Sequence, residues 1–251
     1  MRPHGLRWLA VGSLALLPGC SAPATPARGA GPARSVLLIT IDTLRADRVG
    51  AYGAAGARTP ALDALARDGL RVDRAWTTAP ITLPAHASLL TGLYPPGHGA
   101  RHNGLALPQA VPTLATALNA AGFATAAFVS AFPLDQRFGL ARGFDVYDDQ
   151  LPRATDGRPL NERPGAETVA RATAWLQAHR SGRFFLWVHL FEPHAPYGLP
   201  DSGAGVQVRY ADEIATADRE VGRLVAALES TAASTLVVAT ADHGEAFGEH
   251  D

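Results

Sequence analysis

Four short runs of apolar and β-branched residues recur along the chain and predict buried β-strands. The runs cover Ser35–Ile41, Phe123–Val129, Phe184–Leu190 and Thr235–Thr240. Each is almost continuously apolar, which is typical of strands that are covered on both faces of a parallel sheet. We therefore expect four strands of a parallel sheet that is covered on both faces.

The segments between these runs show helical spacing and residues that start or stop helices. We expect helices over Pro60–Arg67 with Thr59 as N-cap and Gly69 as stop, Pro112–Ala121 ending at Gly122, Ala166–His179, and Asp212–Glu229 with apolar Ile214, Val221, Leu224, Val225 and Leu228. Pro84 and Gly92 bracket one more short helix, whose first N–H groups lie next to Thr82. Strands that alternate with helices predict an α/β fold, a doubly wound, mostly parallel sheet with helices on both faces.

The N-terminal residues have the pattern of a targeting segment. Arg2 and Arg7 precede an apolar run from Trp8 to Leu17 that is too short to span a bilayer. The following Leu-Pro-Gly-Cys resembles a bacterial lipobox, which would make Cys20 the lipidated first residue of the mature protein. The alternative is an ordinary signal peptide with an incidental cysteine. We predict a signal peptide at 1–19, a lipidated Cys20 with an Ala/Pro/Gly-rich tether to 34, and a catalytic domain at 35–251.

Composition narrows the function. The net charge is −1 and no basic tract is present, so we expect no nucleic-acid partner. Cys20 is the one cysteine, which excludes an intramolecular disulfide framework and an all-cysteine metal site. All 22 basic residues of the Lys+Arg count are arginine. Any anion that this protein binds must therefore be held by arginine or histidine.

Five ordered segments together resemble the sulfatase family, within the alkaline phosphatase superfamily, from about Ser35 to the last residue. These segments are Leu38–Asp47, Thr82–Gly92, Gly143–Asp145, Glu192–Tyr197 and Ala241–Glu245. The chain departs from the family at the nucleophile, where sulfatases carry a Cys or Ser that is oxidised to formylglycine, followed by Pro-x-Arg. This chain has Thr82 and then His86, and threonine cannot become formylglycine. Sulfatases also use lysines to hold the sulfate group, and none is present here.

The carboxyl ends of the predicted strands carry the candidate ligands. Ligands of open α/β sheets bind beyond these ends, where the sequence places Asp42, Glu192 with His194, and Asp242 with His243. In family order, we assign Asp42, Thr82, Asp242 and His243 to one divalent metal ion, Ca²⁺, Mn²⁺ or Zn²⁺. Taken singly, Asp42 is better explained as a turn residue at the end of a strand, and Asp242-His243-Gly244 as a tight turn.

Metal coordination would let Thr82 act as a nucleophile, because it lowers the pKa of a bound hydroxyl. We expect His86 and His194 to hold the ester oxygens or to protonate the leaving group. Arg45 is either an anion contact or a solvated turn charge. His189 lies within an apolar strand and is interpreted as a core residue with satisfied hydrogen bonds.

The resemblance implies a sulfatase-like, metal-dependent hydrolase of sulfate or phosphate esters, with Thr82 as nucleophile. One alternative is a phosphotransferase or phosphodiesterase of the phosphoethanolamine transferase or lipoteichoic acid synthase type, and another is a non-catalytic, lipid-anchored binding protein. The expected substrate is an ester of a small molecule, a glycan or a lipid headgroup. We expect anchoring in the bacterial envelope, on the outer side of the cytoplasmic membrane or in the outer membrane. Because the family match continues to Asp251, where sulfatases usually have further strands, we also expect this sequence to be a fragment.

Lipid attachment through Cys20 is directly testable. Lipid-labelled precursor should mark the wild-type protein but not the Cys20→Ala variant, because the thiol is the attachment point. Several acyl chains are expected, since one chain anchors a protein only weakly. Labelling is read after membrane fractionation, and a soluble, unlabelled wild-type protein would contradict the prediction.

Overall fold

The computed structural model describes residues 34–156, 160–198, 203–228, 231 and 234–249. All of them belong to the compact unit Gly31–Asp251. The predicted signal peptide and Cys20 lie outside the described residues. Among the helices that are described, none has the length and apolar character needed to cross a bilayer.

The core of this unit is a five-stranded sheet in the order β3-β2-β4-β1-β5, and every pair of neighbours is parallel. The strands are β1 Ser35–Ile41, β2 Ala124–Phe128, β3 Val146–Asp148, β4 Phe184–Leu190 and β5 Thr235–Ala241. The four predicted strands are all present, with ends within a residue or two of the predicted ones. The edge strand β3 was not predicted, because three residues are too few to show a period.

The helices are α1 Pro60–Asp68, α2 Thr82–Thr91, α3 Pro95–His98, α4 Leu114–Ala120, α5 Gly165–His179 and α6 Val206–Ala226. Four short 3₁₀ turns, Ala46–Arg48, Gly50–Tyr52, Phe132–Leu134 and Gln136–Phe138, complete the described elements. The doubly wound α/β architecture predicted from the sequence is confirmed.

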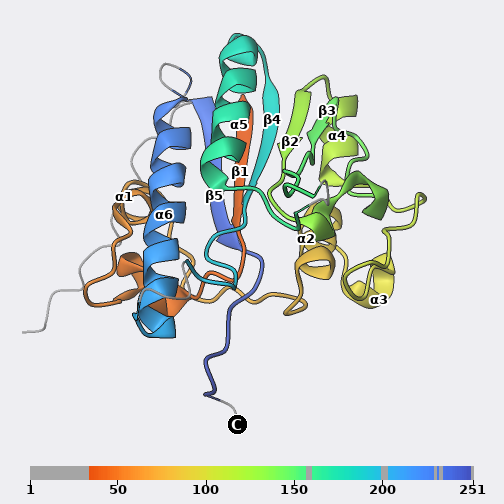
Figure 1. Ribbon diagram of the computed structural model, residues 1–251. Helices are drawn as coiled ribbons and strands as arrows, with labels where there is room; N and C mark the ends of the chain where they lie inside the picture. Colours follow the sequence, from red (N-terminus) through yellow and green to blue (C-terminus); the bar gives the residue numbers. More distant parts are fainter. Residues whose placement is uncertain (1–33, 157–159, 199–202, 229–230, 232–233, 250–251) are drawn as a thin grey trace, which may run out of the picture. The chain divides into compact units, whose positions relative to one another are not determined.

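Both faces of the inner strands β2, β4 and β1 are covered, and the alternation of side chains along them divides the core in two. The edge strand β5 differs from the prediction, because Leu236 and Val238 on one of its faces are exposed. On β4, Phe184, Leu186 and Val188 pack with α5 and α6, while Phe185 and Trp187 pack on the opposite face with residues of α2 and α4. Figure 1 shows α5 and α6 in front of the central strands. This explains the continuously apolar strand sequences, since a strand buried on both faces has no solvent side.

Three helix starts differ from the predicted ones by two residues or more. The first helical residue of α2 is Thr82 itself. The helix ends at Thr91, and the predicted stop Gly92 follows as its C-cap with a left-handed φ of 71°. Helix α4 begins at Leu114 because Thr113 and Thr116 form a capping box. Helix α6 begins at Val206, six residues before the predicted Asp212. Local start signals therefore placed the helices correctly and their first turns less well.

Arg163 is fully buried and fastens the segment that follows β2. Its guanidinium donates to the Asp148 carboxylate at 2.7 Å, to the carbonyl of Val129 at 3.0 Å and to the Thr168 hydroxyl at 3.0 Å. Its backbone N–H donates to the carbonyl of Ser130 at 2.9 Å. The arginine therefore links the end of β2, the edge strand β3 and the start of α5.

Removing the partner of this buried charge should destabilise the fold. We expect Asp148→Ala to lower the free energy of unfolding by about 3 kcal/mol, because a buried guanidinium loses its carboxylate. The matched control is Asp68→Ala, which breaks the exposed Arg67–Asp68 pair. This variant should change the free energy of unfolding by less than about 1 kcal/mol. Denaturant unfolding measures both, and equal effects would contradict a structural role for Arg163.

Candidate metal and catalytic site

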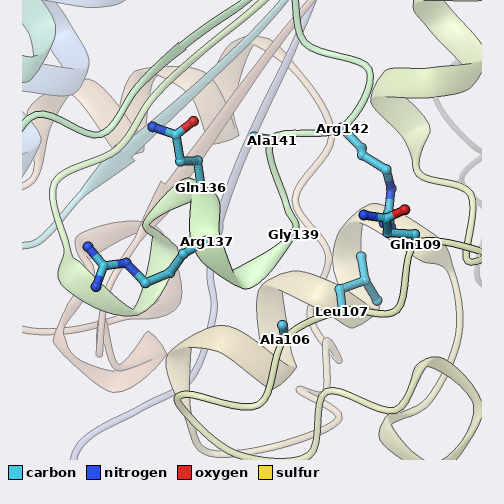
Figure 2. A pocket seen from close by; sticks show the side chains of 8 residues that line it. All are labelled: Ala106, Leu107, Gln109, Gln136, Arg137, Gly139, Ala141 and Arg142. Atoms are coloured by element: carbon cyan, nitrogen blue, oxygen red, sulfur yellow. The ribbon is translucent and has the colours of Figure 1, made fainter.

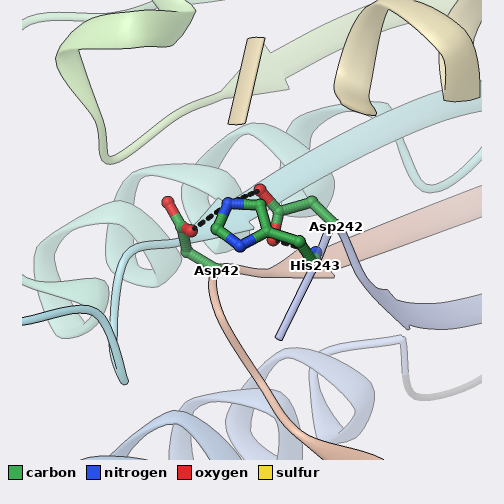
Figure 3. A group of neighbouring side chains, drawn as sticks. All are labelled: Asp42, Asp242 and His243. Atoms are coloured by element: carbon green, nitrogen blue, oxygen red, sulfur yellow. Dashed lines mark hydrogen bonds and ion pairs between the residues drawn. The ribbon is translucent and has the colours of Figure 1, made fainter. Parts of the chain in front are cut away.

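Asp42, Asp242 and His243 meet at the carboxyl edge of the sheet, beyond the neighbouring strands β1 and β5. One ligand atom from each lies within 4.8 Å of the others. The Nε2 atom of His243 is 3.5 Å from Asp42 Oδ1 and 3.4 Å from Asp242 Oδ2. Figure 3 shows the imidazole between the two carboxylates. The structure thus brings together three of the four ligands that the sequence predicted.

Backbone groups fix the orientation of the Asp242 carboxylate. Its Oδ1 atom accepts hydrogen bonds from the N–H of Thr43 at 3.2 Å and from the N–H of His243 at 2.8 Å. Thr43 has a left-handed φ of 52°, which is uncommon for a β-branched residue. The second oxygen, Oδ2, is left without a hydrogen bond and faces His243.

The tautomer of His243 suits a ligand. Its Nδ1 lies 2.9 Å from the carbonyl oxygen of Gly244, which can only accept, so Nδ1 carries the proton. Nε2 then has a free lone pair and points at the two carboxylates. A hydrogen bond to the other ring nitrogen is the usual way in which proteins orient a metal-binding imidazole.

The unpartnered atoms test whether this site fits a cation. Among the described residues, both oxygens of Asp42, Oδ2 of Asp242 and Nε2 of His243 are buried without a hydrogen bond. Buried polar groups are normally paired, and clustered acceptors without donors need a positive charge. Burial raises the pKa of Asp42 and Asp242, and the Asp42 charge raises that of Asp242 further. Two carboxylates and one imidazole suit a divalent metal ion.

Thr82 opens helix α2 beside this cluster, as the first helical residue. It is almost fully buried, and its hydroxyl makes no hydrogen bond within the described part of the chain. Its carbonyl accepts a 2.8 Å hydrogen bond from His86 Nδ1, and the same nitrogen lies 3.6 Å from Asp242 Oδ2. A single nitrogen of the His86 ring therefore lies near both the Thr82 backbone and a ligand carboxylate.

The surroundings of His86 do not favour the acid–base role that we expected for it. The ring is fully buried, Nδ1 is bonded to Thr82, and Nε2 accepts from the Thr40 hydroxyl at 3.0 Å. Trp187 Nε1 donates to the same hydroxyl at 3.0 Å. Burial lowers the pKa of His86 to about 4. The neutral side chain connects the start of α2 to β1 through Thr40, whose hydroxyl also binds Trp187 of β4.

His194 and Glu192 follow β4 at the same edge of the sheet. His194 is half-buried, its Nδ1 is 2.5 Å from the carbonyl oxygen of Ala195, and its ring stacks on Phe191 at 4.5 Å. Its electrostatic influence reaches Asp42. Glu192 instead accepts from the N–H of Gly165 at 2.9 Å and so caps helix α5. His194 is therefore only partly buried at this edge of the sheet, whereas the Glu192 carboxylate is used to cap a helix.

Arg45, for which the sequence left two roles open, is held by neighbours. Its guanidinium donates to Asp47 at 2.9 Å and to Glu249 at 2.5 Å, and lies over the Phe247 ring at 5.5 Å. The backbone N–H of Arg45 donates to the Tyr210 hydroxyl at 3.0 Å. These contacts join the loop after β1 to the segment after β5. The arginine organises the site rather than contacting an anion.

Sequence reasoning missed two residues of the site. Asn103 accepts the N–H of Leu83 at 2.9 Å, in the first turn of α2, and so lies next to Thr82. His189, interpreted as a satisfied core residue, is buried, but its Nε2 has no hydrogen bond among the described residues and lies 3.5 Å from Asp42. The available signal for His189 was its register on β4, where it pairs with Thr40, which is two residues before Asp42.

The pocket shown in Figure 2 is lined by other residues than those of the candidate metal site. It encloses about 290 Å³ and is lined by Ala106, Leu107, Gln109, Gln136, Arg137, Gly139, Ala141 and Arg142. The side chains of Arg137 and Arg142 point in different directions. Arg137 pairs with Asp135, and Arg142 donates to the carbonyl of Val111. No acid or imidazole lines the pocket, so it offers no comparable chemistry.

Asp242→Asn should separate metal binding from stability. The raised carboxylate pKa values mean that the metal-free folded chain holds protons more tightly than the unfolded chain. Its stability should therefore fall as the pH rises from about 4 through those values. Asparagine keeps the Oδ1 acceptor and removes the charge. We expect a higher melting temperature in EDTA at neutral pH and no stabilisation by Mn²⁺.

Thermal unfolding with EDTA or Mn²⁺, at several pH values, measures both effects. In the wild type the Mn²⁺ stabilisation should grow with pH, since bound carboxylates must be deprotonated. An Asp242→Asn protein that kept the full Mn²⁺ stabilisation would contradict the ligand assignment.

Three comparisons place this chain and its fold among known proteins. The ulvan-active sulfatase of Formosa agariphila is 27% identical over 264 residues, which cover 86% of this chain and 52% of that protein. The multifunctional alkaline phosphatase superfamily protein PehA of Trinickia caryophylli is 26% identical, over 86% of this chain and 64% of that protein. The crystal structure of a phosphonate monoester hydrolase of Agrobacterium radiobacter has a TM-score of 0.70, at 21% identity, over 84% of this chain and 62% of that one.

The chain thus spans between half and two thirds of the length of these relatives. The family model described as Sulfatase matches residues 34–251, which is nearly the whole chain and all of the described fold. With the ordered segments and the parallel sheet, this match identifies the chain as a member of the sulfatase family.

Proposed function

We propose that this protein is a metal-dependent hydrolase of sulfate or phosphate esters, with Thr82 as its nucleophile. The observation that carries the proposal is the cluster of unpartnered, buried ligand atoms of Asp42, Asp242 and His243 beside the start of α2. Thr82 opens that helix with a hydroxyl that is not used in the fold. Ligand set and nucleophile therefore belong to one site.

Asp42, Asp242 and His243 would hold the metal, and the Thr82 hydroxyl would complete the set. Zn²⁺ or Mn²⁺ suits this set better than Ca²⁺, because one ligand is an imidazole nitrogen. When bound, such an ion lowers the pKa of a coordinated hydroxyl and offsets negative charge on the ester. The N-terminal N–H groups of α2 add a positive end next to the nucleophile.

The reaction would proceed by two displacements. The Thr82 hydroxyl gives up its proton to a base as its oxygen forms a bond to phosphorus or sulfur, and the bond to the leaving alcohol breaks as that alcohol takes up the proton. Water then loses a proton to the same base as it attacks the same centre, and the bond to Thr82 breaks as the Thr82 oxygen is reprotonated. His194 is the group we assign to proton transfer, because its Nε2 is left as an acceptor when Nδ1 donates to Ala195.

Threonine favours phosphate over sulfate esters as substrates. A formylglycine hydrate expels sulfate by breaking its own C–O bond, whereas an ester of threonine must be released by a second attack at phosphorus or sulfur. The relatives include proteins named for sulfatase and for phosphonate monoester hydrolase activity, which supports both ester types. We propose phosphate esters as the better substrates.

Uncharged groups and histidines would bind the ester oxygens. With Arg45 held by Asp47 and Glu249, and without lysine anywhere in the sequence, the neighbours that remain are His194 and Asn103. The side-chain nitrogen of Asn103 is a donor beside the first turn of α2. Binding would thus depend more on the metal charge than in lysine-containing sulfatases.

The remaining alternatives are a phosphotransferase and a non-catalytic binding protein. A transferase would form the same ester on Thr82 and pass it to an alcohol in place of water. The binding protein would need no nucleophile, and the free Thr82 hydroxyl argues against it. Attachment to the cell envelope through Cys20, with a glycan or lipid headgroup ester as substrate, stays part of the proposal.

A covalent ester on Thr82 is the sharpest test of this function. Thr82→Ala should lose nearly all turnover of an aryl phosphate diester, because nucleophile and ligand are removed together. Thr82→Ser should keep a measurable rate, since it retains the hydroxyl. Mass spectrometry of acid-quenched wild type should find an added phosphoryl mass on the peptide containing Thr82.

Paired assays on aryl phosphate diesters and aryl sulfates test the preferred ester, and added alcohol acceptors test for transfer. A clear preference for sulfate, with no adduct and an active Thr82→Ala variant, would show that the mechanism is wrong. Metal binding without turnover of either ester in the full-length protein would favour the binding-protein alternative.

A further inference from the structure

His189 is a buried imidazole that the proposed chemistry does not use. It lies next to last in β4, with no solvent exposure, on the face that carries Trp187. Its Nε2 is 3.5 Å from Asp42 Oδ2, and neither atom has a hydrogen bond among the described residues. Two unpartnered polar atoms that face one another in an apolar interior are each other's natural partners.

The backbone sets which nitrogen of His189 carries the proton. The N–H of Ser130 lies 3.4 Å from Nδ1, which must therefore be the acceptor. The Ser130 hydroxyl donates to the carbonyl of His189 at 2.6 Å and contacts the Thr168 hydroxyl at 2.8 Å. The first bond is to the ring and the others hold the backbone beside it, and the protonated Nε2 is the nitrogen that lies 3.5 Å from Asp42 Oδ2.

Asp42 thus stands between two imidazoles. Oδ1 faces Nε2 of His243, and Oδ2 faces Nε2 of His189, each at 3.5 Å. His189 does not belong to the described group of ligand atoms that lie within 4.8 Å of one another. The two oxygens therefore have different surroundings, one at the metal site and one at a proton donor.

We propose that His189 is a positioning residue, which donates Nε2–H to Asp42 Oδ2 and so holds Oδ1 toward the metal. The inference rests on the proposed function, because it assumes a divalent ion between Asp42, Asp242 and His243. A carboxylate fixed by such a bond cannot swing away when the site is empty. Loss of an outer hydrogen bond of this kind typically lowers metal affinity by about 10–100-fold.

The test is Mn²⁺ affinity, measured by calorimetry on the full chain. His189→Leu removes the donor and should weaken binding by about 10–100-fold, whereas His189→Gln keeps an N–H donor and should retain most of the affinity. The matched control is His98→Leu. His98 is equally buried, but its nitrogens are bonded to Ser88 and Ala100. It should lose thermal stability and keep the wild-type affinity.

Thermal unfolding in EDTA separates folding from binding in each variant. Unchanged affinity in a folded His189→Leu protein, or equal losses in the Leu and Gln variants, would overturn the proposal. X-ray absorption of the metal-loaded wild type should count one imidazole ligand, and two would overturn it in favour of direct ligation by His189. A wild type that binds no Mn²⁺ would refute the proposed function itself. Loss of Mn²⁺ affinity in His189→Leu alone would support the inference.

Discussion

The burial of two carboxylates side by side is the constraint on which this structure depends. Asp42 and Asp242 end neighbouring strands of an apolar sheet, and almost no water reaches either of them. A buried carboxylate is costly unless it is hydrogen-bonded and its charge is balanced. Two of them at one edge demand either protons or a cation. Most of the surrounding contacts place hydrogen-bond donors or imidazoles around these two carboxylates.

The protein itself supplies little positive charge to these groups. Among the described ion pairs, those of Asp42 and Asp242 are all with imidazoles and none is with an arginine. Burial lowers the pKa of both His86 and His189 to about 4, so these two rings are neutral at neutral pH. They orient the carboxylates without neutralising them. The remaining negative charge must be balanced either by protons, as the raised pKa values of Asp42 and Asp242 indicate, or by a bound cation.

Features that repeat along the chain could be predicted from the sequence. The doubly wound sheet follows from continuously apolar runs, and the meeting of Asp42 with Asp242 follows from parallel strands, whose carboxyl ends share one edge. Features that depend on how one side chain faces another could not. Spacing places His86 one turn after Thr82, but only the fold shows that its ring turns inward to Thr40. The same holds for Arg45, whose partner Glu249 is 204 residues away.

The left-handed conformation of Thr43 has a consequence for how this protein can change. That backbone geometry delivers the N–H that fixes Asp242 Oδ1, yet a β-branched residue adopts it at a cost of order 1–3 kcal/mol. Glycine or asparagine would adopt it with less strain, so the position is a place where selection for a more durable fold would change the residue. The Tyr210 hydroxyl, which donates to the Thr43 carbonyl at 2.6 Å, holds the strained residue in place. Because the N–H belongs to the backbone, glycine at this position would keep the hydrogen bond to Asp242 and lose the strain of the β-branched side chain.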